Sequence, residues 1–176
     1  MRKILLIVSL LFLSAACSPS ENSAQPATAA TEAQEQATPI PTPTPAYTQA
    51  DYLSDAENLL RDWSDAFSEF NEFLQDRQND EDDPEWKTSF AEKVSKMENA
   101  GEKLGKLTPP TDALVQLDQD LKTLSYEIGV FVIAERGYWI DKNTNQNDVA
   151  LEHLGTIVDL QLSIMDKIDS MKQIEY

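Results

Sequence analysis

The feature of this 176-residue sequence that most constrains its fold is a repeated spacing of three and four residues between mostly apolar positions after Tyr47. An α-helix turns once every 3.6 residues, so this spacing places the side chains along one face of a helix. Four such runs are separated by short polar or proline-containing segments. Gly101, in the second run, is expected to permit close approach of a neighbouring helix. The predicted inward positions are, run by run, Tyr52, Ala56, Leu59, Trp63, Ala66, Phe70 and Phe73; Phe90, Val94, Met97, Gly101, Leu104 and Leu107; Leu114, Leu117, Leu121, Leu124, Ile128 and Phe131; and Leu154, Ile157, Gln161, Ile164, Ile168 and Met171.

Capping signals mark where the helices begin. Thr48 and Asp51 have the spacing of a capping box, in which each residue satisfies a free backbone N–H of the other. Asp83 before Pro84 is a favourable cap and first-turn pair for the second helix. Two adjacent prolines then separate the second helix from the third, because proline is tolerated only in the first turn. The sequence therefore predicts an all-α protein, an antiparallel up-down-up-down four-helix bundle over residues 47–176, which follows a disordered tether.

The N-terminal residues have the pattern of an export signal. Arg2 and Lys3 precede a ten-residue apolar run, 4–13, that is interrupted only by Ser9. This run is too short to cross a bilayer as a helix, which needs about 20 residues. Residues 1–16 are therefore predicted to be a signal peptide that is removed during export.

The stretch Leu13-Ser14-Ala15-Ala16-Cys17 resembles the lipobox of bacterial lipoproteins, with Ser14 standing where that motif usually has Leu. The resemblance implies that Cys17 becomes the first mature residue and carries acyl chains such as palmitate. It also implies a protein anchored to the membrane of the bacterial cell envelope, on the extracytoplasmic side. The alternative is ordinary signal-peptidase cleavage after Ala16, since small side chains at Ser14 and Ala16 also suit that enzyme.

Residues 17–46 are predicted to be the acylated cysteine and a disordered tether. The stretch 18–46 contains six Pro, seven Ala and five Thr, and it has no aromatic residue. Such a composition cannot bury enough apolar surface to offset the entropy lost on ordering. Its proline-rich end, 39–45, is expected to be an extended polyproline II segment. A proline-rich ligand for a recognition domain is the alternative interpretation of this segment.

The charge of the chain excludes one class of partner. There are 31 acidic and 14 basic residues, a formal charge of −17, so binding to nucleic-acid phosphates is disfavoured. Loss of Arg2 and Lys3 with the signal peptide makes the mature chain still more acidic. An acidic domain on a tether is repelled by anionic headgroups, so it is expected to stand away from the membrane and to be accessible to cations or basic partners.

Residues suited to catalysis are few in the predicted bundle. His153 is the one histidine of the sequence and Cys17 its one cysteine, which excludes a Cys–His nucleophile or a histidine-rich zinc site in the bundle. The third run, continued, places Glu135 at an inward position, at a similar distance from the turn as His153. A buried Glu–His pair would be a small proton-active site. Alternatively, Glu135 lies at the edge of the apolar face and reaches water, Lys or Arg, and His153 is a solvated or capping residue.

The turn before the fourth helix resembles the EF-hand calcium loop. Oxygen-bearing side chains occupy positions one, three, five, seven and twelve of a twelve-residue window. Two positions differ from the motif, since Gln146 replaces its glycine and Asp148 stands at a usually apolar position. An asparagine-rich turn followed by a capped helix is the alternative. The candidate calcium ligands are Asp141, Asn143, Asn145, Asn147 and Glu152.

Residues 128–134 are apolar on nearly every side of the third helix, which is unusual for a helix with one face in solvent. They predict either wide burial beneath the aromatic residues of the first helix or an exposed patch that docks a partner or apolar ligand. The candidate patch consists of Val130, Val132, Ile133, Tyr138 and Trp139.

The favoured hypothesis is a non-enzymatic, lipid-anchored binding module at the cell envelope. Its partners are the membrane, through Cys17, and an unidentified envelope protein or small ligand, and it needs no cofactor. The alternative places a calcium site at Asp141–Glu152, or a proton-active site at Glu135 and His153, in or beside the bundle.

Overall fold

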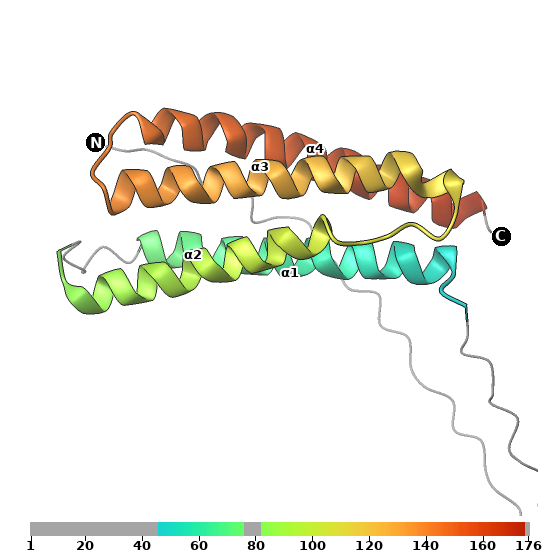
Figure 1. The fold of residues 1–176 in the computed structure, drawn as a ribbon, viewed down its shortest axis with the longest axis horizontal. Helices are drawn as coiled ribbons and strands as arrows, with labels where there is room; N and C mark the ends of the chain where they lie inside the picture. Colours follow the sequence, from blue (N-terminus) through green and yellow to red (C-terminus); the bar gives the residue numbers. More distant parts are fainter. Residues whose placement is uncertain (1–45, 76–81, 175–176) are drawn as a thin grey trace, which may run out of the picture. The chain divides into compact units, whose positions relative to one another are not determined.

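The computed structural model describes residues 46–75 and 82–174, which form four α-helices and one short 3-10 helix (Figure 1). This confirms the predicted all-α, four-helix fold. The predicted signal peptide, Cys17 and nearly all of the predicted tether lie outside the described residues. The elements are α1 (Gln49–Gln75), α2 (Pro84–Leu104), η1 (Asp112–Leu114), α3 (Val115–Trp139) and α4 (Gln146–Ile174).

The predicted caps are present at the starts of α1 and α2. The Asp51 N–H donates to Thr48 Oγ1 at 3.1 Å, and the Thr48 N–H donates to Asp51 Oδ2 at 2.9 Å. A hydrogen bond from the Thr48 hydroxyl to Asp51 Oδ2, at 2.7 Å, and then the bond from the Thr48 N–H lower the pKa of the Asp51 carboxyl. Asp83 accepts a hydrogen bond from the Glu85 N–H at 3.0 Å, and Pro84 opens α2. Both helices therefore begin where the local sequence supplies partners for free N–H groups.

The end of α2 differs from the prediction. The helix ends at Leu104, one turn before Leu107, which was expected to be its last inward position. Gly105 is the C-cap, and the prolines that follow cannot continue a helix. Leu107 still packs, half-buried, against the core from the connecting segment.

Consecutive helices are antiparallel, as the order of their contacts shows. Between α1 and α2, Phe73 packs against Trp86 with ring centroids 5.4 Å apart, and the earlier Phe70 packs against the later Phe90 at 5.8 Å. Between α2 and α3, Trp86, near the start of one helix, packs against Trp139, at the end of the other. Each helix therefore returns along the one before it.

The fourth helix completes the arrangement. It packs most closely with α3, beside which it lies in Figure 1. The contact between α4 and α1 is less extensive than the contacts between α1 and α2, α2 and α3, or α3 and α4. Polar contacts follow the same antiparallel order. They join Lys167 to Asp120 and His153 to Glu127 between α4 and α3, and Lys172 to Glu57 and Gln161 to Ser64 between α4 and α1.

The core consists of the four apolar faces. All six inward positions predicted for the third helix are buried, and Gly101 of α2 is buried against Ile128 of α3. Leu59, a predicted inward position, is half-buried against the core beside the buried Leu60, and Trp86 is a core residue that the periodicity did not indicate. The fourth helix fits its predicted face less completely, since Leu154, Gln161 and Met171 are half-buried.

Candidate functional site

The turn between α3 and α4 differs from an EF-hand loop in one respect that matters for its ligands. Helix α4 begins at Gln146, the sixth position of the twelve-residue window, so Asn147 and Glu152 are already helical. In an EF-hand the chain wraps around the ion through these positions. The side chains of Asp141, Asn143, Asn145 and Glu152 are exposed, and that of Asn147 is half-buried.

The same turn has the hydrogen bonds of an asparagine-rich turn. Asn143 Oδ1 accepts from the Asn145 N–H at 3.2 Å, and the Asn143 carbonyl accepts from the Gln146 N–H at 3.0 Å. Lys142 has a positive φ of 57°, in the left-handed region that reverses the chain. Asn143 therefore uses its side chain to stabilise the turn itself, which favours the alternative interpretation of this segment.

His153 is paired with Glu127, two helical turns from the partner predicted for it. Its Nδ1 lies 2.5 Å from Glu127 Oε2, between α4 and α3. The side chains are 24% and 15% exposed, so the pair lies at the edge of the seam between the helices and not in the core. The contact between the imidazole and the carboxylate joins α3 and α4, the two most closely packed helices.

Glu135 is half-buried, which fits the predicted alternative of a position at the edge of the apolar face. Its Oε2 accepts a hydrogen bond from the indole Nε1 of Trp139, one turn later on α3, at 2.8 Å. The half-buried ring of Trp139 packs against both Trp86 and Tyr138. Glu135 therefore helps to orient the aromatic side chain that closes this end of the core.

A buried polar network lies at the opposite end of the bundle. Asp118, 6% exposed, accepts from Lys122 Nζ at 2.7 Å and from the Tyr52 hydroxyl at 3.4 Å. Burial, and then the Asp118 charge, raise the pKa of the fully buried Tyr52 hydroxyl. The network joins the first turns of α1 and α3 across the bundle, and the apolar spacing did not indicate it.

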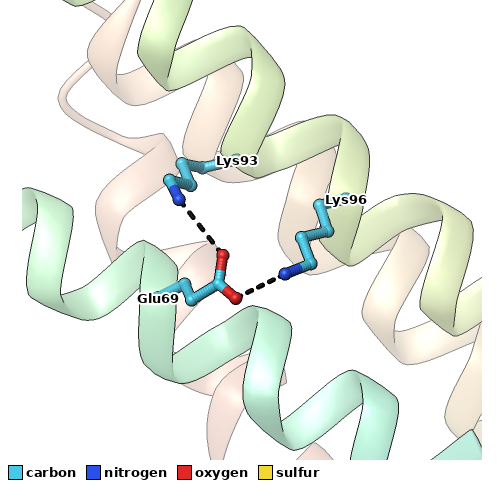
Figure 2. A network of polar contacts seen from close by, with 3 residues as sticks. All are labelled: Glu69, Lys93 and Lys96. Carbon is cyan, nitrogen blue, oxygen red and sulfur yellow. Dashed lines mark hydrogen bonds and ion pairs between the residues drawn. The ribbon is translucent and has the colours of Figure 1, made fainter.

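An open groove of about 670 Å³ lies between α1 and α2. Figure 2 shows the contact that crosses it, in which the carboxylate of Glu69 on α1 reaches both Lys93 and Lys96 on α2. Hydrogen bonds from Lys96 and from Lys93 lower the pKa of Glu69. Glu69 therefore holds two helices together. The charged lining consists of Asp62, Asp65, Glu69, Glu92, Lys96 and Lys103.

The predicted docking patch on α3 is divided by the structure. Val132 is fully buried, so it belongs to the core, because it lies on the side of α3 that faces the other helices. Trp139 is half-buried against Trp86, and Tyr138 is half-buried beside it. Burial, the first of the two predicted outcomes for this stretch, therefore holds for Val132, whereas Ile133 is 64% exposed.

The exposed apolar surface of α3 is a different set of residues. Tyr126, 67% exposed, lies seven residues before Ile133, and Ile140, 41% exposed, lies seven after it. Seven residues are nearly two helical turns, so the three side chains share one face. Val130, from the predicted patch, is half-buried beside them. The heptad spacing from Ile133 was the signal in the sequence that could have identified Tyr126.

The described part of the chain holds no group of three or more His, Cys, Asp or Glu side chains placed to bind a metal ion. None of its helices combines the length and apolar character needed to cross a membrane. Comparisons with family models, with curated proteins and with solved structures found no match to this chain. The class that the structure defines is thus an acidic four-helix bundle, and its function must be argued from its own residues.

Proposed function

We propose that this protein is a lipid-anchored, extracytoplasmic helical module that acts by binding and not by catalysis. Cys17 is the attachment site, residues 18–46 are the tether, and the four-helix bundle is the binding domain. The anchor is supported by the position of the one cysteine of the sequence, directly after a lipobox-like Leu13-Ser14-Ala15-Ala16 stretch. More than one acyl chain is needed for stable anchoring, and a lipoprotein cysteine supplies this.

The exposed apolar face of α3 is the main support for the proposed binding role. Residues 47–176 contain 28 acidic and 12 basic side chains, so the domain carries a large net negative charge. Tyr126 and Ile133 are nevertheless two-thirds exposed on one face of α3. Large apolar side chains gathered on an otherwise charged surface are typical of interaction sites.

The use of the charged side chains also supports a binding module. Glu69 holds Lys93 and Lys96 between α1 and α2, and Glu98 pairs with Arg136 between α2 and α3 at 2.7 Å. These groups serve to fix the helices relative to one another. A rigid framework of this kind suits a domain that presents a surface.

The anchor is tested by feeding cells an alkyne-bearing fatty acid and labelling the full chain, Cys17→Ser, and the matched neighbour Ser18→Ala. The full chain and Ser18→Ala are expected to carry the label and to fractionate with membranes, and Cys17→Ser to do neither. An unlabelled wild-type chain that begins at Cys17 would instead indicate ordinary signal-peptidase cleavage and would refute the anchor.

A further inference from the structure

The seam between α1 and α4 has the least contact of the four seams between neighbouring helices. Two polar contacts cross it. Lys172 Nζ donates to Glu57 Oε2 at 2.6 Å, and Gln161 Nε2 donates to Ser64 Oγ at 2.7 Å. Because the helices are antiparallel, the part of α1 after Ser64 faces the part of α4 before Gln161. That half of the seam lies beyond both of these contacts.

On the α1 side, burial decreases as the seam continues beyond Ser64. Leu53 and Leu60 are buried, whereas Phe67 and Leu74, which continue the same spacing of seven residues, are only half-buried. A spacing of seven residues keeps side chains on one face of a helix, so the difference comes from the neighbouring helix. The cover that α4 gives to α1 therefore decreases toward the end of α1.

The α4 side of the same half is also apolar and partly uncovered. Leu154 lies seven residues before Gln161, so it faces α1, and it is half-buried. Leu151 and Val158, three residues before and four residues after Leu154, lie beside it on the helix. Leu151 is 44% exposed and Val158 is half-buried. The two helices thus leave apolar side chains partly open on both sides of one seam.

A buried donor without a partner lies beside this open half. Trp63 is 3% exposed and stacks on Phe67, with ring centroids 5.1 Å apart. In the described part of the chain, Trp63 Nε1 is the one buried side-chain nitrogen or oxygen that has no hydrogen-bond partner. An unsatisfied buried donor is unfavourable, and the N–H of a buried Trp usually has a partner. A molecule that supplied an acceptor atom here would remove this cost.

The lining of the open half selects the kind of molecule. Residues 47–176 contain 28 acidic and 12 basic side chains, so the net charge of the domain disfavours an anionic ligand. The side chains along the open half are nevertheless uncharged, so they offer no partner to a cation. Trp63 supplies a donor and needs an acceptor. The lining consists of Phe67, Asn71, Leu74, Leu151, Leu154 and Val158.

From the partly open seam, the N–H without a partner and the uncharged lining together, we infer that this end of the α1–α4 seam binds an uncharged lipid-like molecule. The molecule has an apolar body and a carbonyl oxygen, and this oxygen accepts a hydrogen bond from Trp63 Nε1. Its apolar body packs against Phe67 and the half-buried side chains of α4. Ligand sites between the helices of a bundle have this composition, an apolar lining with few polar groups. The inference goes beyond the proposed function, because the site lies away from the exposed face of α3 and does not depend on the anchor.

Binding of the dye Nile red to the full chain carrying Cys17→Ala tests the site. Nile red is uncharged and apolar, it has a ring carbonyl, and its fluorescence rises in apolar surroundings. We expect saturable binding that Trp63→Phe weakens about two- to tenfold, the effect of losing one hydrogen bond. Diphenylhexatriene, an apolar dye without an acceptor, is the matched probe and should lose less affinity than Nile red. Equal losses for the two dyes would contradict a hydrogen bond from Trp63.

Two charge substitutions locate the bound dye. Val158→Asp places a carboxylate in the open half of the seam and is expected to weaken Nile red binding at least tenfold. Ile133→Asp, on the exposed face of α3, should leave the affinity unchanged, and circular dichroism shows whether each variant is folded. Loss of binding in Ile133→Asp with binding retained in Val158→Asp would place the dye on α3. That result, or no saturable binding to the Cys17→Ala chain, overturns the inference.

NMR of the indole N–H groups tests the site without a substitution in it. The chain has three tryptophans, so Trp86→Phe and Trp139→Phe assign the Trp63 signal by elimination. Nile red is expected to shift this signal downfield, because the N–H gains an acceptor. An unmoved signal at saturating dye would mean that water alone meets the N–H and would overturn the inference. The anchor is absent from these chains, so failure here bears on the seam alone, and failure of fatty-acid labelling bears on the anchor alone.

Discussion

Gly101 on α2 lies so close to Ile128 on α3 that a Cβ at position 101 would stand 2.5 Å from Ile128 Cγ2. Both residues are buried, and the branched Ile128 side chain has little rotamer freedom in a helix. The separation of α2 and α3 at this level is therefore set by the absence of a side chain at Gly101.

Gly101→Ala is expected to destabilise the domain by about 1–2 kcal/mol, because the two helices must move apart in a well-packed core. The measurement is the free energy of unfolding in urea. Gly155→Ala is the matched control, since it meets nothing within 4 Å and is expected to stabilise the domain by up to about 1 kcal/mol. If Gly101→Ala raised the free energy of unfolding, as Gly155→Ala is expected to do, packing at Gly101 would not limit the separation of the helices.

The face of each helix could be predicted from the sequence, but the level at which helices meet could not. The spacing around Gly101 correctly indicated close helix approach. Counting from the turn, in contrast, placed His153 level with Glu135 in one of the two interpretations. His153 instead pairs with Glu127, which lies eight residues, or about 12 Å along α3, from Glu135. Periodicity determines direction around a helix axis, whereas position along the axis depends on how the turn and the core side chains pack.

Neighbouring residues in a uniformly apolar stretch also could not be separated from the sequence. Val132 is fully buried and Ile133 is 64% exposed, yet both lie in a stretch without polar markers. Where every side is apolar, hydrophobicity carries no directional signal, and only the packed neighbours decide which side chain is covered.

Ionisation of Tyr52 is expected to destabilise the fold at alkaline pH. Its pKa is raised in the folded state, so the contribution to stability is complete below the unfolded value near 10 and is lost as pH rises above it. Between pH 10 and the folded-state pKa, Tyr52→Phe should reduce the slope of unfolding free energy against pH by up to about 1.4 kcal/mol per unit. Tyr126→Phe, which removes an exposed hydroxyl, is the control and should keep the wild-type slope. Equal slopes for Tyr52→Phe and the wild type would contradict the assignment.

Adjacent charge substitutions on α3 should have opposite outcomes. Val132→Asp places an unpaired carboxylate in the core and is expected to cost at least about 3 kcal/mol or to prevent folding. Ile133→Asp should keep the helical circular dichroism and change the stability of the domain by less than about 0.5 kcal/mol. If Ile133→Asp also unfolds the domain, the face proposed for docking is part of the core.

Millimolar calcium is expected to leave the melting temperature unchanged. Helix α4 begins before Asn147 and Glu152, and Asn143 bonds to its own turn, so the turn is already formed by its own hydrogen bonds. A thermal-shift titration of the wild type and Glu152→Gln makes the test. Stabilisation by calcium that disappears in Glu152→Gln would restore the EF-hand interpretation.

The pair formed by His153 and Glu127 is expected to couple α3 and α4 energetically. Their 2.5 Å contact is partly shielded from water, so a double-mutant cycle of Glu127→Gln and His153→Gln should give a coupling of about 1 kcal/mol in urea unfolding. The cycle of Glu135→Gln with His153→Gln is the matched control and should be additive within about 0.5 kcal/mol. A larger coupling to Glu135 than to Glu127 would mean that α3 and α4 meet at a different level, two turns from the observed one.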